Sequence, residues 1–187
     1  MSTLAASTVL IFGDSLSAGY GIALAQSWPA LLAKRLDEKH LAYSVTNASI
    51  SGETTAGGRA RFTETVDRAK PAVVVIALGA NDGLRGLSIS QMRENLKAMI
   101  DAAKTQKAKV LLIGMKLPPN YGPDYARQFE QTFSEVAKEE RVALLPFLLQ
   151  PIALDGSAYQ ADGLHPTAAA QPKLLDHIWP ALQGLLK

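Results

Sequence analysis

Cysteine is absent from the 187 residues, and its absence excludes disulfide bonds, thiolate metal sites and cysteine nucleophiles. Long apolar runs are missing too, because the longest, near Pro71–Ala80, falls far short of the roughly 20 residues that span a bilayer. Charge of one sign is also scarce, since 19 Lys and Arg residues oppose 17 Asp and Glu residues. No basic run exceeds a pair, so we expect neither nucleic acid nor an integral membrane segment among the interactions of this chain.

Short apolar runs alternate with amphipathic stretches along the chain, and the runs predict five strands. These strands are Thr8–Phe12, Tyr43–Thr46, Ala72–Leu78, Val110–Ile113 and Val142–Leu145. The run at 72–78 is β-branched without a polar face, which is typical of a central strand covered on both sides.

Apolar residues at helical spacing predict four helices between and after the strands. The residues that mark these helices are Trp28, Leu32 and Leu36; Met92, Leu96 and Met99; Phe129, Phe133 and Val136; and Leu174, Leu175 and Ile178. Ser27 is predicted to cap the first helix, and Ser88 with Gln91 forms a capping-box pattern before the second. The alternation favours an α/β fold in one domain over 1–187, with its core at about 8–186. This fold is a three-layer α/β/α sandwich around a mainly parallel five-stranded sheet.

Ligand sites in such sheets lie at the carboxyl ends of the strands, so the loops that follow the strands are the places to search. Ser15 follows the first strand and suits either a nucleophile or an ordinary turn serine, while Asp14 favours a turn or helix cap. Gly52 follows the second strand and Asn81 the third. Each of these residues, taken alone, is explained by turn formation.

Three histidines are present, and they occupy different settings. His40 ends a helix, and His177 falls off the apolar stripe of the last helix, so we expect it to be solvated. His165 lies in a loop bounded by glycine and proline, three residues after Asp162. A serine hydrolase needs a base and a carboxylate that orients it, and these two residues would supply both from one short loop.

Four segments occur in the order that is typical of one enzyme family. Gly13-Asp14-Ser15-Leu16, Gly52, Gly79-x-Asn81-Asp82 and Asp162-x-x-His165-Pro166 together resemble the four signature blocks of the SGNH/GDSL hydrolases. The resemblance runs from about Thr8 to the C-terminus and is strongest toward the bacterial thioesterase I, lysophospholipase L1 and arylesterase subgroup. The nucleophile elbow of α/β-hydrolases, Gly-x-Ser-x-Gly, is absent from the sequence.

The resemblance implies a flavodoxin-like SGNH fold and a role for each matched residue. Ser15 would be the nucleophile, His165 the base and then the acid, and Asp162 the carboxylate that orients the base. The oxyanion hole would use the backbone N–H groups of Ser15 and Gly52 and the side-chain amide of Asn81. No metal and no cofactor is implied.

The implied substrates are small-molecule carboxylic esters and thioesters, such as acyl-CoA, aryl esters and lysophospholipids. Loop residues that would contact the acyl chain are Leu84, Met115, Leu117, Pro118 and Tyr121. The sequence departs from the subgroup at two positions. Ala80 stands in place of a second glycine, and Lys116 stands in place of an arginine.

Two other functions remain open, namely esterase activity on an acetylated carbohydrate and a non-catalytic α/β binding module. We expect a monomer. The resemblance implies a periplasmic or secreted location, although Met1–Leu10 shows neither the charged segment nor the long apolar core of a signal peptide. An exported form would therefore need a leader beyond this sequence.

Overall fold

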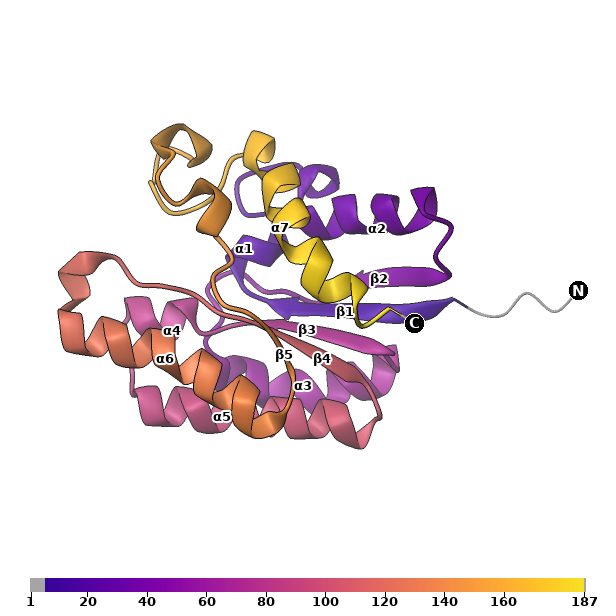
Figure 1. Ribbon diagram of the computed structural model, residues 1–187, viewed down its shortest axis with the longest axis horizontal. Helices are drawn as coiled ribbons and strands as arrows, with labels where there is room; N and C mark the ends of the chain where they lie inside the picture. Colours follow the sequence, from indigo (N-terminus) through magenta and orange to yellow (C-terminus); the bar gives the residue numbers. More distant parts are fainter. Residues whose placement is uncertain (1–5, 187) are drawn as a thin grey trace, which may run out of the picture.

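The computed structural model describes residues 6–186. The first five residues of Met1–Leu10, where a signal peptide would be expected, and Lys187 lie outside the described part. Five parallel strands form one sheet, as the sequence predicts (Figure 1). Their order in the sheet is β2-β1-β3-β4-β5. The strands are β1 Ser7–Gly13, β2 Tyr43–Asn47, β3 Val73–Ala77, β4 Lys109–Ile113 and β5 Ala143–Leu145.

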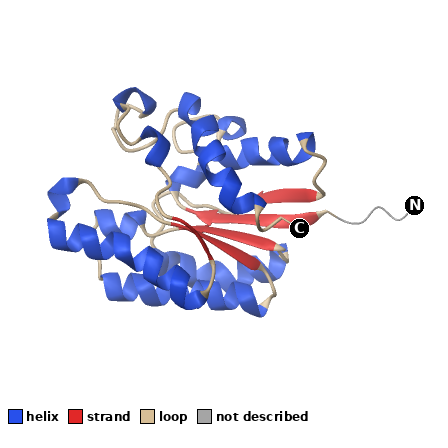
Figure 2. Ribbon diagram, in the orientation of Figure 1, coloured by secondary structure: helices blue, strands red, loops and turns tan. Residues whose placement is uncertain are grey.

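Helices cover both faces of this sheet and complete the three layers (Figure 2). They are α1 Ser15–Ala18, α2 Trp28–Glu38, α3 Thr55–Ala69, α4 Ala80–Leu84, α5 Ile89–Thr105, α6 Pro123–Glu140 and α7 Gln171–Gln183. The helices α2 and α7 lie on one face, whereas α3, α5 and α6 lie on the other (Figure 1). Within residues 6–186, no helix is both long enough and apolar enough to cross a bilayer.

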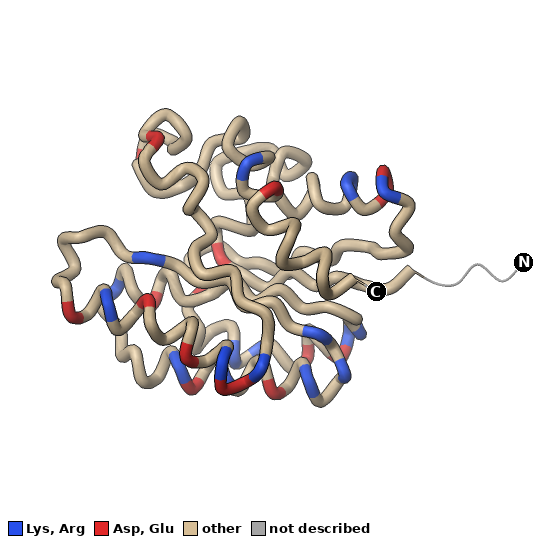
Figure 3. Tube along the Cα trace, in the orientation of Figure 1, with Lys and Arg blue, Asp and Glu red and all other residues tan. Residues whose placement is uncertain are grey.

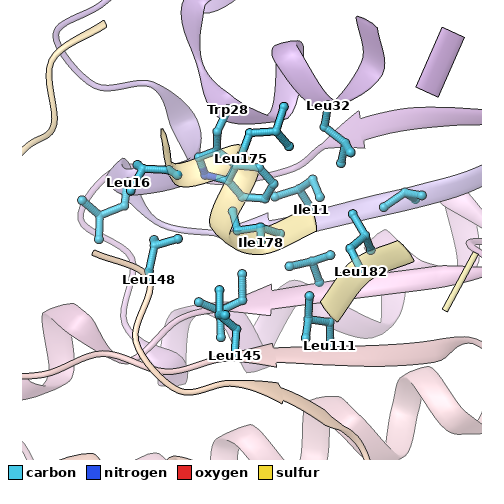
Figure 4. Close-up of a cluster of buried hydrophobic side chains, with 14 of the residues drawn as sticks. Ile11, Leu16, Trp28, Leu32, Leu111, Leu145, Leu148, Leu175, Ile178 and Leu182 are labelled. Atoms are coloured by element: carbon cyan, nitrogen blue, oxygen red, sulfur yellow. The ribbon is translucent and has the colours of Figure 1, made fainter. Parts of the chain in front are cut away.

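Alternate side chains of the central strands enter two separate hydrophobic cores, because successive residues of a strand point to opposite faces. Val9 and Ile11 of β1 pack toward α2 and α7, in the cluster shown in Figure 4. Leu10 and Phe12 pack toward α3, α5 and α6. All four are fully buried, which explains why β1 is apolar at every position from 9 to 12.

The start of α2 differs from its prediction. Ser27 occupies the N-cap position, but its hydroxyl donates to the Leu24 carbonyl at 2.7 Å and does not cap the helix. The N–H of Trp28 instead donates to the side chain of Gln171 in α7, at 2.9 Å. The tight turn that precedes α2 turns the serine hydroxyl backwards, and a distant glutamine takes over the cap.

The helix α3 is not predicted by the sequence pattern, because its 15 residues contain two glycines and few apolar positions. Phe62 and Val66 supply its buried face. At Gly58 an added Cβ would lie only 2.4 Å from the side chain of Leu78, so the missing side chain lets the helix approach the sheet closely. A position without a side chain therefore brings α3 into close contact with the residues beneath it.

The order of the strands places a crevice beside β1. This strand pairs with β2 on one side and with β3 on the other, so the connections that leave β1 and β3 turn toward opposite faces of the sheet. Parallel sheets bind ligands at such switch points, outside the carboxyl ends of the strands. The loops after β1, β2 and β3, which carry Ser15, Gly52 and Asn81, meet there.

Candidate active site

Ser15 is the first residue of α1, immediately after β1 and its capping residue Asp14. The Asp14 carboxylate accepts the N–H of Leu16 at 3.0 Å, so the interpretation of this residue as a helix cap is confirmed. The cap forces a sharp turn between strand and helix. Ser15 is half-buried and its hydroxyl faces the crevice.

The crevice brings Ser15 together with two residues from the loop before α7. The Ser15 Oγ lies 2.8 Å from Nε2 of His165, across 150 residues of sequence. The other ring nitrogen, Nδ1, lies 2.6 Å from Oδ2 of Asp162. Such a chain of hydroxyl, imidazole and carboxylate is the arrangement in which a serine is activated as a nucleophile.

The Asp162 carboxylate is held by the backbone as well as by the imidazole. Its Oδ1 accepts the N–H of His165 at 3.0 Å and the N–H of Leu164 at 2.9 Å. These contacts, first the backbone N–H of His165 and then its ring, lower the pKa of Asp162 to about 2. The carboxylate is therefore ionised at neutral pH, where it can stabilise a positively charged imidazole.

Gly52 and Asn81 line the same crevice from neighbouring loops. The Asn81 Nδ2 donates to the Glu53 carbonyl at 3.0 Å and lies 3.5 Å from Oδ2 of Asp14. Because both neighbours are acceptors, the NH₂ end of the amide is fixed on this side. Gly52 adopts a φ of +80°, which favours glycine, and its carbonyl accepts Nη2 of Arg85 at 2.9 Å.

Asp82 is a buried residue of the site region to which the sequence assigns no role. Its carboxylate accepts both the N–H of Thr55, at 2.8 Å, and the Thr55 hydroxyl, at 2.5 Å. The Asn95 amide completes this network by donating to the same hydroxyl at 3.1 Å. These bonds join α4 to the start of α3 and so hold Asn81, one residue before Asp82, in place.

The crevice widens into a cavity of about 780 Å³. Four of the five residues expected to contact the acyl chain line it, namely Leu84, Met115, Leu117 and Pro118. Tyr121 does not, because its hydroxyl turns back to donate to the Leu84 carbonyl at 3.0 Å. Tyr121 thus supports the wall of the cavity from behind.

Further residues line the cavity although the sequence pattern assigns them no role. They are Tyr20, Phe147, Leu149, Ala153, Tyr159 and Leu164. All lie beyond the carboxyl ends of β1 or β5. That position in the topology could have identified them, and Leu164 also stands between Asp162 and His165.

The two departures from the subgroup both lie at this cavity. Ala80 is buried at the first position of α4, next to Asn81. Lys116 forms an ion pair with Glu130 at 2.8 Å, and its Nζ lies 5.7 Å from the centre of the Phe147 ring.

The remaining histidines lie outside the cavity lining. His40 is exposed just after α2. The prediction that His177 is solvated is wrong, since its ring is half-buried and Nε2 lies 2.9 Å from the Phe147 carbonyl. The chain after β5 folds back over α7 and covers this ring.

Burial raises the pKa of Asp14 to about 6, against opposing effects from the Leu16 N–H and from His165. A folded-state pKa above the unfolded value of 3.8 means that the neutral carboxyl is the form that folding favours. The contribution of the neutral Asp14 carboxyl to stability is complete below about pH 4 and is lost as the pH rises through about 6. We expect wild type to lose up to about 3 kcal/mol of stability between pH 4 and 7, relative to Asp14→Asn.

Urea unfolding of both proteins across this range measures the difference. Asparagine is the matched substitution, because it caps helices well but does not titrate. Asp162 is present in both proteins, so its own titration cancels. A difference in unfolding free energy that stays constant from pH 4 to 7 would contradict the raised pKa.

Comparison with known proteins agrees with this geometry. The profile of the GDSL-like lipase/acylhydrolase family matches residues 11–171. Esterase TesA of Pseudomonas aeruginosa is 50% identical over 182 residues, covering 97% of this chain and 90% of that protein. Thioesterase 1/protease 1/lysophospholipase L1 of Escherichia coli is 41% identical over 182 residues, covering 97% and 86%.

The fold is shared as well. The crystal structure of the psychrotrophic esterase EstA from Pseudoalteromonas sp. superposes with a TM-score of 0.92 at 36% identity, covering 96% of this chain and 98% of that one. The sequence match and the shared fold lead to one conclusion: the chain belongs to the GDSL-like lipase/acylhydrolase family of ester hydrolases.

Proposed function

We propose that the protein hydrolyses carboxylic esters and thioesters through an acyl-enzyme formed on Ser15. The observation that carries this proposal is the hydrogen-bonded chain from Ser15 Oγ through the His165 ring to Asp162, at 2.8 and 2.6 Å. Ser15 and His165 lie at a cavity whose lining is largely apolar. An apolar lining is what a substrate with an acyl group requires.

In the first half of the reaction, His165 takes the hydroxyl proton while Oγ attacks the carbonyl carbon. The carbonyl oxygen becomes negative and is stabilised by the N–H groups of Ser15 and Gly52 and by the Asn81 amide. The bond to the leaving oxygen or sulfur then breaks, and His165 donates its proton to the leaving group.

In the second half of the reaction, a water molecule enters beside His165, and the imidazole accepts a proton from this water. The resulting hydroxide equivalent attacks the acyl carbon, and the same donors stabilise the second oxyanion. The acid leaves when the bond to Ser15 Oγ breaks and the serine recovers its proton from His165. The ionised carboxylate of Asp162 stabilises the imidazolium in both halves.

The similar proteins support this chemistry. EstA of Pseudoalteromonas sp. has been crystallised inhibited by monoethylphosphonate, a tetrahedral phosphorus group that resembles an ester transition state. The names of the relatives add an esterase, a thioesterase and a lysophospholipase. We therefore propose acyl-CoA, aryl esters and lysophospholipids as substrates.

Labelling with a fluorophosphonate probe tests the proposed chemistry directly. A serine activated by His165 should be labelled within minutes, whereas a preincubation with an ester substrate should slow the labelling. A protein that stays unlabelled would refute a nucleophilic Ser15 and would favour the non-catalytic binding module.

The cavity lining favours acyl chains over an acetylated carbohydrate. Leu84, Met115, Leu117 and Pro118 present apolar groups, and each buried methylene would contribute up to about 0.8 kcal/mol. The kcat/KM should thus rise severalfold for every two carbons until the cavity is filled. An acetyl ester of xylose hydrolysed faster than any longer acyl ester would instead favour the carbohydrate function.

Leu117 is the residue through which the acyl wall can be tested. It lines the cavity and also packs against the core cluster under α5 and α6. We expect Leu117→Ala to flatten the chain-length dependence, so that octanoyl esters lose about tenfold or more in kcat/KM while acetyl esters change little. Initial rates with aryl esters of two to ten acyl carbons measure this dependence.

Leu144→Ala is the matched control, because Leu144 packs against the same core cluster but is not part of the cavity lining. It should lower stability and leave the slope of rate against chain length intact. If Leu117→Ala slows every chain length equally, as a purely structural change would, Leu117 does not form the acyl wall.

The family resemblance further supports one catalytic domain over the whole chain, a monomer and a periplasmic or secreted location. Sedimentation at micromolar concentration tests the monomer, and fractionation of the source cells tests the location. A defined dimer or a cytoplasmic pool would overturn the respective proposal.

A further inference from the structure

Tyr20, in the loop after α1, contacts the imidazole that the proposed mechanism uses. The centres of the Tyr20 and His165 rings are 4.4 Å apart, with 38° between the ring planes. Yet Tyr20 is 52% exposed and its ring lines the mouth of the cavity. A large aromatic ring in this position presents one face to the histidine and leaves apolar surface open to a ligand.

The backbone holds Tyr20 to both halves of the site. Its N–H donates to the Ser15 carbonyl at 3.2 Å, and its carbonyl accepts Nε2 of Gln160 at 2.8 Å. Gln160 in turn donates its own N–H to the His165 carbonyl at 2.8 Å. The backbone of Tyr20 is therefore fixed relative to the serine and the histidine, which keeps its ring close to the reacting groups.

The direction of proton transfer shows which part of a substrate meets this ring. Nε2 of His165 returns the proton to the leaving group, so the leaving oxygen or sulfur must lie next to that nitrogen. The substrate carbonyl oxygen accepts hydrogen bonds from the N–H groups of Gly52 and Asn81. The acyl group extends along the cavity wall that includes Leu117. The leaving group is thus the part of the substrate that lies beside Tyr20.

Charge is scarce around this end of the cavity. Residues 15–33 contain no Lys, Arg, Asp or Glu, and Leu164, next to His165, is 47% exposed. Positions of Lys, Arg, Asp and Glu are instead frequent along α3, α5 and α6 (Figure 3). The carboxylate of Asp162 is engaged by the histidine and by two backbone N–H groups. An aromatic leaving group therefore finds an apolar ring face at this end of the cavity.

We infer that Tyr20, with Leu164, forms a leaving-group subsite that selects aromatic alcohols over alkyl alcohols. The inference rests on the proposed function and specifies its substrate class. In the step concerned, the ester C–O bond breaks, the acyl group stays on Ser15, and the phenol leaves with the proton from His165. A phenyl ring that stacks on Tyr20 is bound before and during this step.

The test compares two esters that share an acyl group, phenyl butyrate and ethyl butyrate, in wild type, Tyr20→Leu and Tyr20→Phe. The kcat/KM reports the steps up to release of the alcohol, where the leaving group is still present. We expect Tyr20→Leu to lower kcat/KM for phenyl butyrate by about 3–10-fold and to change that for ethyl butyrate less than twofold. Tyr20→Phe, which keeps the ring, should restore the preference.

Deacylation supplies a second readout, since both esters give the same butyryl-enzyme. Its rate, from rapid-quench measurements, should be the same in Tyr20→Leu and wild type. Tyr125→Leu is the matched control: this tyrosine is half-buried outside the cavity lining, with its hydroxyl on the Leu87 carbonyl, and should alter neither ester.

An equal loss for both esters, together with slower deacylation, would overturn the subsite and make Tyr20 a residue that positions His165. Failure of the proposed function looks different, because wild type would then hydrolyse neither ester and would resist the fluorophosphonate probe.

Discussion

Replacing Ser15 with alanine should lower kcat for ester hydrolysis by a factor on the order of 10⁴–10⁶. The hydroxyl oxygen is the atom that attacks the carbonyl carbon, and Nε2 of His165 lies 2.8 Å from it, in position to take its proton. Without this oxygen no acyl-enzyme can form, so the remaining donors of the oxyanion hole would act only on direct attack by water.

The variant should fold normally, because Ser15 is half-buried and the cap of α1 comes from the Asp14 side chain. Circular dichroism and urea unfolding check this expectation beside the kinetics. Ser134→Ala, which removes a hydroxyl from the exposed surface of α6, controls for preparation and should keep full activity. Turnover by Ser15→Ala within tenfold of wild type would remove Ser15 from the mechanism.

Asn81→Ala should lower kcat by roughly 10²–10³ with little change in KM. One N–H of the Asn81 amide donates to the Glu53 carbonyl at 3.0 Å, which fixes the NH₂ end in the crevice. The other N–H makes only a long contact with Asp14, at 3.5 Å, and is available to an oxyanion. A donor in this place binds a neutral carbonyl weakly and a developing oxyanion strongly, so its removal affects the transition state more than the bound substrate.

The amide also holds the Glu53 carbonyl, so part of any loss in rate can come from a looser loop around Gly52. Asn81→Asp separates the two effects: it keeps the size of the side chain but presents acceptors to the oxyanion, and it should be at least as slow as the alanine variant. Unfolding free energies of both variants measure the structural part. A rise in KM with kcat unchanged would instead make Asn81 a residue that positions substrate.

The strands could be predicted from the sequence because burial on both faces leaves a direct compositional trace. The run at 72–78 is apolar throughout, and β3 occupies its centre, at Val73–Ala77. The alternation of strands and helices indicated the parallel sheet, and the sheet located the loops with Ser15, Gly52 and Asn81. The helix α3 left no such trace, because it meets the sheet through a glycine at position 58.

The amino-acid sequence specifies which chemical groups are available, namely a serine, a histidine, carboxylates and no thiol, and in which order they follow the strands. Which of these groups contact one another depends on the folded arrangement of the chain. Ser15 and His165 are 150 residues apart along the chain and 2.8 Å apart in space. The raised pKa of Asp14 and the contact of Tyr20 with His165 likewise arise from packing between distant segments. Local composition cannot encode such properties, because desolvation and distance depend on every segment that surrounds a residue in the folded chain.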